Sequence, residues 1–226
     1  MTNAALTVNS LMKIKQDGEK IAMLTCYDAT FASEMDQAGV DIILVGDSLG
    51  MVVQGGSSTV GVEVEDIAYH TACVAEGINR VFLLADMPFG SYHDPLTAFE
   101  NAVSLLSAGG HMVKLEGAGP MIEVVEYLTS RGVPVCGHLG LTPQSVHQLG
   151  GYRVQARLEE EAQQLLRDAR ALQDAGAQLL VVECIPSVLG AEVSTNLDIP
   201  VIGIGAGSDC DGQVLVMHDM LGLGGR

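Results

Sequence analysis

Eight short apolar runs recur along the chain, and each ends in a polar residue or a glycine before a helix-like stretch begins. They lie at residues 20–28, 41–47, 81–87, 112–117, 133–140, 178–184, 199–207 and 214–219. Continuous apolar runs of this length, rich in β-branched residues, are typical of parallel strands covered on both faces. The pattern predicts strands and helices that alternate along most of the sequence.

The stretches between the runs carry helix start and stop signals. Asp94 precedes Pro95, which places a cap residue before a proline at the first helical turn. The segment 159–177 begins with acidic residues and has periodic leucines, and the segment 29–40 closes on Gly39. These signals predict helices in the positions that an alternating fold requires.

Eight strand–helix units in 226 residues indicate a (β/α)₈ TIM barrel, and we expect residues 1–226 to form this single domain. An open, doubly wound sheet is the alternative. Two features depart from a regular barrel. Only "SDCDGQ" separates the last two runs, and the sequence ends at "MLGLGGR" without a closing helix. We therefore expect the C-terminal helical segment to be missing or to be supplied from elsewhere.

The charge balance excludes two classes of partner. The chain has 28 acidic and 11 basic residues, for a formal charge of -17. Nucleic acids and anionic membrane surfaces bind to clustered Lys and Arg, so we expect neither as a partner. Small molecules are the expected ligands.

Cysteine usage and the sequence ends favour a cytoplasmic protein. The five cysteines are odd in number and form no C-x-x-C pair, which is typical of reduced thiols. The N-terminus lacks the cationic start and apolar run of a signal peptide. No apolar stretch approaches the roughly 20 residues that a membrane helix needs.

Carboxylates stand at the ends of four predicted strands: Asp47, Asp86, Glu116 and Glu183. Barrel enzymes place their chemistry at these ends, where four negative charges would repel one another strongly. A divalent cation relieves this repulsion, and a set of oxygen ligands favours Mg²⁺. We expect Asp47 and Asp86 to be direct ligands, with Glu116 as a third ligand or as the holder of a bound water.

An acidic residue at the end of a strand can also have a structural role, and this alternative differs among the candidates. Asp47 could cap the next helix or a turn, and capping is the favoured role for Asp28. Asp86 precedes Met87-Pro88, which argues against direct capping. Glu183 ends an apolar run, where burial would favour the role of a general base.

Lys114 and Glu116 are two residues apart and share one strand face. They could form a structural pair inside the barrel, or Lys114 could bind an anionic substrate. A Schiff-base role for Lys114 is a further alternative, but nearby metal-ligand candidates make a metal–enolate route simpler. His138, in "CGHLGLTP", could belong to the core or to the site.

Two glycine-containing stretches are ambiguous. The segment 203–207, "GIGAG", could cradle a phosphate or allow close packing at the barrel end. The polar segment 138–161 could be a mobile flap over the barrel mouth or an ordered surface loop.

Several of these motifs, in order, resemble the ketopantoate hydroxymethyltransferase family. They include "LVGDSLGMVVQG", "LLADMPFGSY", "MVKLEG", "VPVCGHLGLTPQSV", "GGYRVQ" and "PVIGIGAG". The resemblance implies a barrel of the phosphoenolpyruvate/pyruvate superfamily, assembled as a homodecamer. It implies the transfer of a hydroxymethyl group from 5,10-methylenetetrahydrofolate to 3-methyl-2-oxobutanoate, giving 2-dehydropantoate in pantothenate biosynthesis.

The resemblance also assigns roles to residues. It implies a Mg²⁺ site of Asp47 and Asp86 that Glu116 completes or supports. It implies a 2-oxo acid site formed by Asp47, Ser48, Asp86, Lys114 and His138. Glu183 would accept the proton from C3 of this acid, giving a Mg²⁺-stabilised enolate that attacks the one-carbon unit. The folate would lie under the 138–161 segment.

The sequence departs from the family in two places. Ala156, Arg157 and Leu158 stand where the family usually has Gly-Arg-Gly, and the family's segment beyond "GLGGR" is absent. Two other functions remain as alternatives: a Mg²⁺-dependent lyase or mutase that needs no folate, and an acidic metal-binding or scaffold protein.

Overall fold

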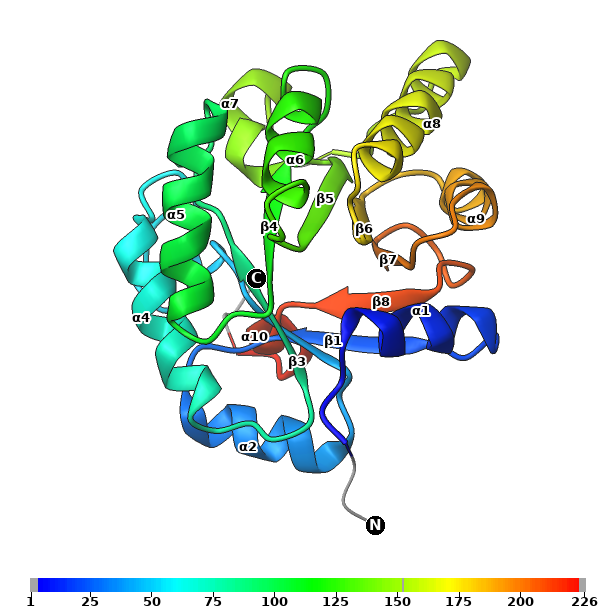
Figure 1. Ribbon diagram of the computed structural model, residues 1–226. Helices are drawn as coiled ribbons and strands as arrows, with labels where there is room; N and C mark the ends of the chain where they lie inside the picture. The colour runs from blue at the N-terminus through cyan, green and yellow to red at the C-terminus, as the bar shows by residue number, and fades with distance from the viewer. Residues whose placement is uncertain (1–3, 152, 224–226) are drawn as a thin grey trace.

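The computed structural model describes residues 4–151 and 153–223, in which eight parallel strands close into a barrel in chain order. Helices surround the barrel, as Figure 1 shows for α2, α4, α5, α6, α8 and α9. The eight predicted strands and the predicted barrel are confirmed, and the open sheet is wrong because β1 pairs with both β2 and β8.

The strands are four to six residues long. They are β1 (Ile21–Thr25), β2 (Ile42–Val45), β3 (Phe82–Asp86), β4 (Met112–Glu116), β5 (Val135–Gly140), β6 (Leu179–Glu183), β7 (Val201–Ile204) and β8 (Gly212–Leu215).

The longer helices are α1 (Val8–Gln16), α2 (Ala29–Ala38), α4 (Val64–Ala75), α5 (Pro95–Ser107), α6 (Met121–Thr129), α8 (Glu159–Asp174) and α9 (Ser187–Asn196). The short helices are α3 (Leu49–Val52), η1 (Pro143–Ser145), α7 (Val146–Leu149) and α10 (Met217–Met220).

The capping residues predicted from the sequence begin and end helices in the structure. Asp28 caps α2 by accepting a hydrogen bond from the Phe31 N–H at 2.9 Å, and Gly39 ends this helix in the left-handed conformation. Asp94 caps α5, which starts at Pro95. Local capping chemistry therefore fixes these boundaries.

The region around the last strand differs from the sequence-based boundaries. The connection 205–211 forms turns and bends and no helix, as its length predicted. The apolar run 214–219 is not one strand: β8 begins earlier and ends at Leu215, and α10 starts at Met217. Apolar character alone cannot separate a short strand from the buried start of the following helix.

Two hydrophobic layers hold the fold together. The inner layer fills the barrel and includes Met23, Ile42, Leu84, Met112 and Leu179. The outer layer lies between the strands and the surrounding helices. Alternate residues of each strand face the two layers, which explains why the strands read as continuous apolar runs.

Helix α1 belongs to the inner layer although the apolar runs do not predict it. Its Leu11 is buried among the residues that fill the barrel. Lys15 anchors the helix by donating to the carbonyl oxygens of Ser194 and Ile199 and pairing with Asp211 at 2.8 Å. Within the described residues, none of the helices has both the length and the apolarity that a bilayer crossing requires.

Candidate active site

A cavity of about 310 Å³ opens among the carboxyl ends of the strands. It is lined by Thr25, Leu44, Gly46, Asp47, Ser48, Met51, Thr59, Asp86, Lys114, Glu116, His138, Pro143, Val181, Glu183, Ile204, Val214, Val216 and Asp219. All seven residues singled out from the sequence are therefore present in one cavity. A volume of this order suits a small ligand.

Neighbouring strands deliver these side chains in chain order. Asp47 follows β2, Asp86 ends β3, His138 lies in β5 and Glu183 ends β6. The register of the strands aligns Asp86 with Lys114 and Glu116 with His138. Because the strands are parallel, residues at their carboxyl ends converge at one end of the barrel.

Asp47 and Asp86 form the first half of the site. The backbone N–H of Asp47 donates to Asp86 Oδ2 at 3.1 Å, and Lys114 Nζ lies 2.8 Å from Asp86 Oδ1. Burial and the negative charge of Asp86 raise the pKa of Asp47 to about 8. Burial also raises the pKa of Asp86, although the Lys114 charge opposes this shift. The protein thus holds two carboxylates where ionisation of both is unfavourable without a further cation.

The alternative interpretation of Asp47 as a helix cap is wrong. Helix α3 has Ser48 as its N-cap and receives no side-chain cap bond. The Asp47 carboxylate instead accepts a hydrogen bond from Gln144 Nε2 at 2.9 Å. The Ser48 hydroxyl lies 2.7 Å from the Tyr27 hydroxyl and lines the same cavity.

His138 forms the second half of the site by joining two carboxylates. Its Nδ1 lies 3.2 Å from Glu116 Oε1, and its Nε2 lies 3.2 Å from Glu183 Oε2. Burial and the Lys114 charge lower the pKa of His138, but the two carboxylates outweigh both and raise it to about 9. The imidazole is therefore protonated at neutral pH and holds Glu116 and Glu183 in place.

Lys114 and Glu116 both point into the barrel, as their spacing predicted. Burial lowers the pKa of Lys114, but the negative charges of Asp86, Glu116 and Asp47 outweigh burial. The net effect raises the pKa above its ordinary value, so the ammonium stays protonated. A protonated amine is a poor nucleophile, which disfavours the Schiff-base alternative. Lys114 is paired with Asp86 and Glu116 with His138, and both side chains line the cavity.

The donor set fits a hard divalent cation. The cavity sets four carboxyl groups, those of Asp47, Asp86, Glu116 and Glu183, against two cationic side chains, those of Lys114 and His138. Asp86 Oδ1 and Glu116 Oε1 are buried carboxylate oxygens, with Lys114 Nζ 2.8 Å from the first and His138 Nδ1 3.2 Å from the second. Mg²⁺ prefers such oxygens and usually takes only one or two carboxylates.

The arrangement distinguishes among the three expected metal ligands. In the described parts of the chain, no group of three or more His, Cys, Asp and Glu side chains is placed to hold one ion together. Glu116 instead faces His138 and accepts the backbone N–H of Gln144 at 3.1 Å. Asp47 and Asp86 are therefore the better placed pair.

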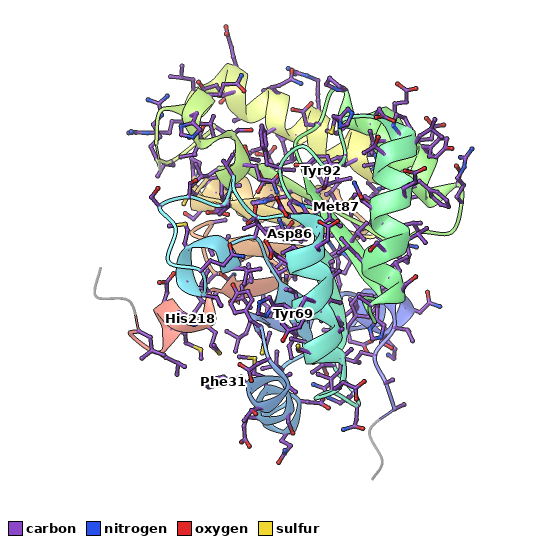
Figure 2. All side chains as sticks on the ribbon, turned by 90° about the vertical axis from the view of Figure 1, so that its left-hand side faces the viewer. Phe31, Tyr69, Asp86, Met87, Tyr92 and His218 are labelled. Atoms are coloured by element: carbon purple, nitrogen blue, oxygen red, sulfur yellow. The ribbon has the colours of Figure 1, made fainter. Side chains whose placement is uncertain are left out.

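Gln144 and Tyr92 complete the site and were not found from the sequence. Gln144 is buried and donates to Asp47 and to the carbonyl oxygen of Met87, each at 2.9 Å. The Tyr92 hydroxyl donates to Gln144 Oε1. Figure 2 shows Asp86, Met87 and Tyr92 side by side in the interior. Both residues lie in connections after a strand, where no spacing rule marks them.

The two ambiguous glycine-containing stretches have structural explanations. A Cβ at Gly207 would lie 2.5 Å from Ser187 Cβ, so close packing accounts for glycine in "GIGAG". The 138–161 segment is tied to the end of β6: Leu141 N–H donates to Glu183 O and Gln155 N–H to Cys184 O, both at 2.8 Å. Cys184 itself adopts a left-handed φ of 48°. Tyr152 lies outside the described residues.

Comparison with known proteins gives the sequence relatives. The profile of the family "Ketopantoate hydroxymethyltransferase" matches residues 5–226. The chain is 58% identical to 3-methyl-2-oxobutanoate hydroxymethyltransferase 1 of Burkholderia cenocepacia, over 97% of this chain and 81% of that protein. It is 60% identical to 3-methyl-2-oxobutanoate hydroxymethyltransferase of Methylobacillus flagellatus, over 95% of this chain and 82% of that protein.

Solved structures support the fold at low sequence identity. Phosphonopyruvate hydrolase, in a complex with oxalate and Mg²⁺, has a TM-score of 0.71 at 12% identity, covering 96% of this chain and 83% of that chain. 2,3-Dimethylmalate lyase, a PEP mutase/isocitrate lyase superfamily member, has a TM-score of 0.69 at 16% identity, and the match covers 96% of this chain and 83% of that chain. These likenesses support the barrel fold.

Proposed function

The chain belongs to the ketopantoate hydroxymethyltransferase family, and from this premise we propose that it makes 2-dehydropantoate from 3-methyl-2-oxobutanoate, water and 5,10-methylenetetrahydrofolate. The products are 2-dehydropantoate and tetrahydrofolate. The observation that carries the proposal is the cavity in which Glu183, His138 and Glu116 face Asp47, Asp86 and Lys114. The reaction needs an acceptor for one proton and a cationic group beside the oxo acid, and in this proposal Glu183 is the first and Lys114 the second.

A Mg²⁺ ion held by Asp47 and Asp86 would withdraw electron density from the keto oxygen of the substrate. Glu116 supports this site through its bonds to His138 and Gln144. Lys114 adds a buried positive charge next to Asp86, which favours an anionic substrate on this side of the cavity. Ser48 offers a hydroxyl group to the same substrate.

Glu183 is the base in this proposal. Its side chain is 17% exposed, so that it stays accessible from the cavity while His138 holds one of its oxygens at 3.2 Å. The carboxylate takes the proton from C3, and the electron pair left on C3 forms the new bond to the one-carbon unit. The methylene carbon of the donor holds two carbon–nitrogen bonds: one breaks as the new carbon–carbon bond forms, and water displaces the second to leave the hydroxymethyl group. The proton from C3 and one proton of the water complete the two N–H groups of tetrahydrofolate.

Further parts of the proposal follow from family membership. The cavity suits the small oxo acid, and the larger folate would extend from it under the 138–161 segment. A homodecamer is the assembly that the family resemblance supports. The five unpaired cysteines agree with a cytoplasmic protein.

Isotope exchange tests the base directly. With Mg²⁺ in D₂O and without folate, the protein should exchange the C3 proton of 3-methyl-2-oxobutanoate for deuterium, followed by NMR. Glu183→Gln should slow this exchange by at least about 100-fold, because it removes the proton acceptor. Glu192→Gln, on the exposed face of α9, is the matched control and should exchange normally.

Two outcomes would contradict the proposal. Undiminished exchange in Glu183→Gln would remove Glu183 as the base. Formation of 2-dehydropantoate that does not depend on methylenetetrahydrofolate would remove the folate as the one-carbon donor. A lyase or mutase would turn over its substrate without any folate, so the second measurement also separates this alternative.

A further inference from the structure

The wall of the cavity is divided into a polar arc and an apolar arc. The polar arc runs from β2 to β6 and carries the ionisable groups described above. On the far side of Glu183, the inward positions of β7 and β8 are aliphatic: Ile204, Val214 and, just after β8, Val216. Val181 on β6 continues this apolar arc below Glu183.

Strand register places the apolar arc directly beside the proposed base. Glu183 is paired with Ile204 across β6 and β7. Ile202 is paired with Gly212, so the same register continued by two residues sets Ile204 beside Val214. Glu183, Ile204 and Val214 therefore lie at one level of the barrel. Ile204 is only half-buried because one side of it faces the cavity.

The chemistry of the substrate then fixes its orientation. The carboxylate and keto oxygens belong on the polar arc, next to Lys114 and to the cation that Asp47 and Asp86 would hold. The C3 hydrogen must reach Glu183, so the alkyl groups on C3 extend past Glu183 towards β7 and β8. Aliphatic walls are favourable for methyl groups and offer nothing to an oxygen atom.

We propose that Ile204 and Val214 hold the alkyl groups on C3 and determine which 2-oxo acids the enzyme accepts. This inference rests on the proposed function, because it takes Glu183 as the base. In this proposal the two side chains contact the two methyl groups of the substrate and disfavour a longer alkyl chain. They are specificity-determining residues and take no part in proton transfer.

Deuterium exchange at C3 tests the inference without folate. The rates are compared for 3-methyl-2-oxobutanoate and 3-methyl-2-oxopentanoate, which differ by one methylene group. Ile204→Ala and Val214→Ala should each raise the ratio of kcat/KM for the longer acid over the shorter acid by about 10-fold or more, since one methylene in an apolar pocket is worth about 10–200-fold. Ile204→Val, which removes a single methylene, should give a smaller change in the same direction.

Leu215→Ala is the matched control. Leu215 is adjacent to Val214 on β8, is 47% exposed and does not line the cavity, so its truncation should leave the ratio unchanged. Thermal unfolding shows whether each variant is folded, and Ile204→Val provides the test if the alanine variants are not.

The outcomes separate the two proposals. An unchanged ratio in the folded Ile204 and Val214 variants, with normal exchange in the parent protein, would overturn this inference and leave the proposed function intact. A complete lack of exchange in the parent protein would overturn the proposed function, and the inference with it.

Discussion

At the scale of single residues, Gln144 connects the groups of the site. Its Nε2 donates to both Asp47 Oδ2 and the Met87 carbonyl oxygen, and its backbone N–H donates to Glu116. The Tyr92 hydroxyl donates to its Oε1, which fixes the orientation of the amide. Gln144 therefore acts through Asp47 as a positioning residue, because the buried amide restrains the carboxylate that would bind the ion.

Gln144→Ala should weaken Mg²⁺ binding by about 10- to 100-fold, the usual effect of removing a group that orients a metal ligand. Isothermal titration of the protein with Mg²⁺, without substrate, measures this affinity directly. Gln163→Ala, on the exposed face of α8, makes the same substitution far from the cavity and should bind Mg²⁺ normally. Equal affinities in the two variants would show that Gln144 does not position a metal ligand.

The contrast between Gln144 and the carboxylates shows what a sequence can reveal about such a site. Asp86 and Glu183 could be predicted because each breaks an apolar run at a strand end, where barrel chemistry occurs. Gln144 follows β5 in a polar connection, where a buried amide and an exposed one have the same surroundings in sequence. Its role depends on contacts with Asp47, 97 residues away, which local patterns do not contain.

At the scale of elements, Ala156 has an unfavourable conformation among the described residues of the 138–161 segment. Ala156 has φ 53°, in the left-handed region. Its neighbours hold it there: Gln155 N–H donates to Cys184 O, and Arg157 N–H donates to Glu161 Oε2 at 3.1 Å. For a residue with a Cβ this conformation costs about 1–2 kcal/mol.

Ala156→Gly should therefore stabilise the protein, by about 0.5–1 kcal/mol, after the greater freedom of glycine in the unfolded chain is subtracted. Urea unfolding, followed by circular dichroism, measures the change in the free energy of unfolding. Ala162→Gly lies inside α8, where the same substitution should destabilise by about 1 kcal/mol. If both variants lose stability alike, the φ of Ala156 is not a source of strain.

The elements themselves were predicted to different degrees. The eight strands could be placed because burial on both faces leaves an apolar run for each. Helix α1 was not among the predicted elements, although Val8, Leu11 and Ile14 lie at helical spacing and pack against the barrel interior. The end of β8 is also hidden, because α10 continues the apolar run with Met217, which is buried against the outer layer.

At the scale of the whole molecule, closure of the barrel depends on strand β8, which joins β7 to β1. Strand β8 has only four residues, and it must pair with β7 on one side and with β1 on the other. Gly212 is paired with both Ile202 and Ile21. The residue before Gly212 adds a further bond across the closing pair of strands, because the Asp211 carbonyl oxygen accepts the Ile21 N–H at 3.0 Å.

Closure requires that position 212 has no side chain. A Cβ there would lie 2.5 Å from the Ile21 carbonyl oxygen and 2.6 Å from Ile202 Cδ1. The Ile21 oxygen belongs to the backbone of β1 and cannot rotate away, so the added methyl group must push β8 outwards from its neighbours. Because the cavity lies at the opposite end of these strands, the strain should affect stability before it affects the site.

Gly212→Ala should lower the free energy of unfolding by about 1–3 kcal/mol, as overpacking in a core does, and by more if β8 separates from β1. Gly61→Ala is the matched control, because a Cβ at Gly61 meets no atom within 4 Å and its φ is not in the left-handed region. Urea unfolding of both variants, with hydrogen exchange of the β1 amides, measures stability and closure together. Normal stability of Gly212→Ala, with β1 amides as protected as in the parent, would show that the barrel tolerates a side chain at its closing seam.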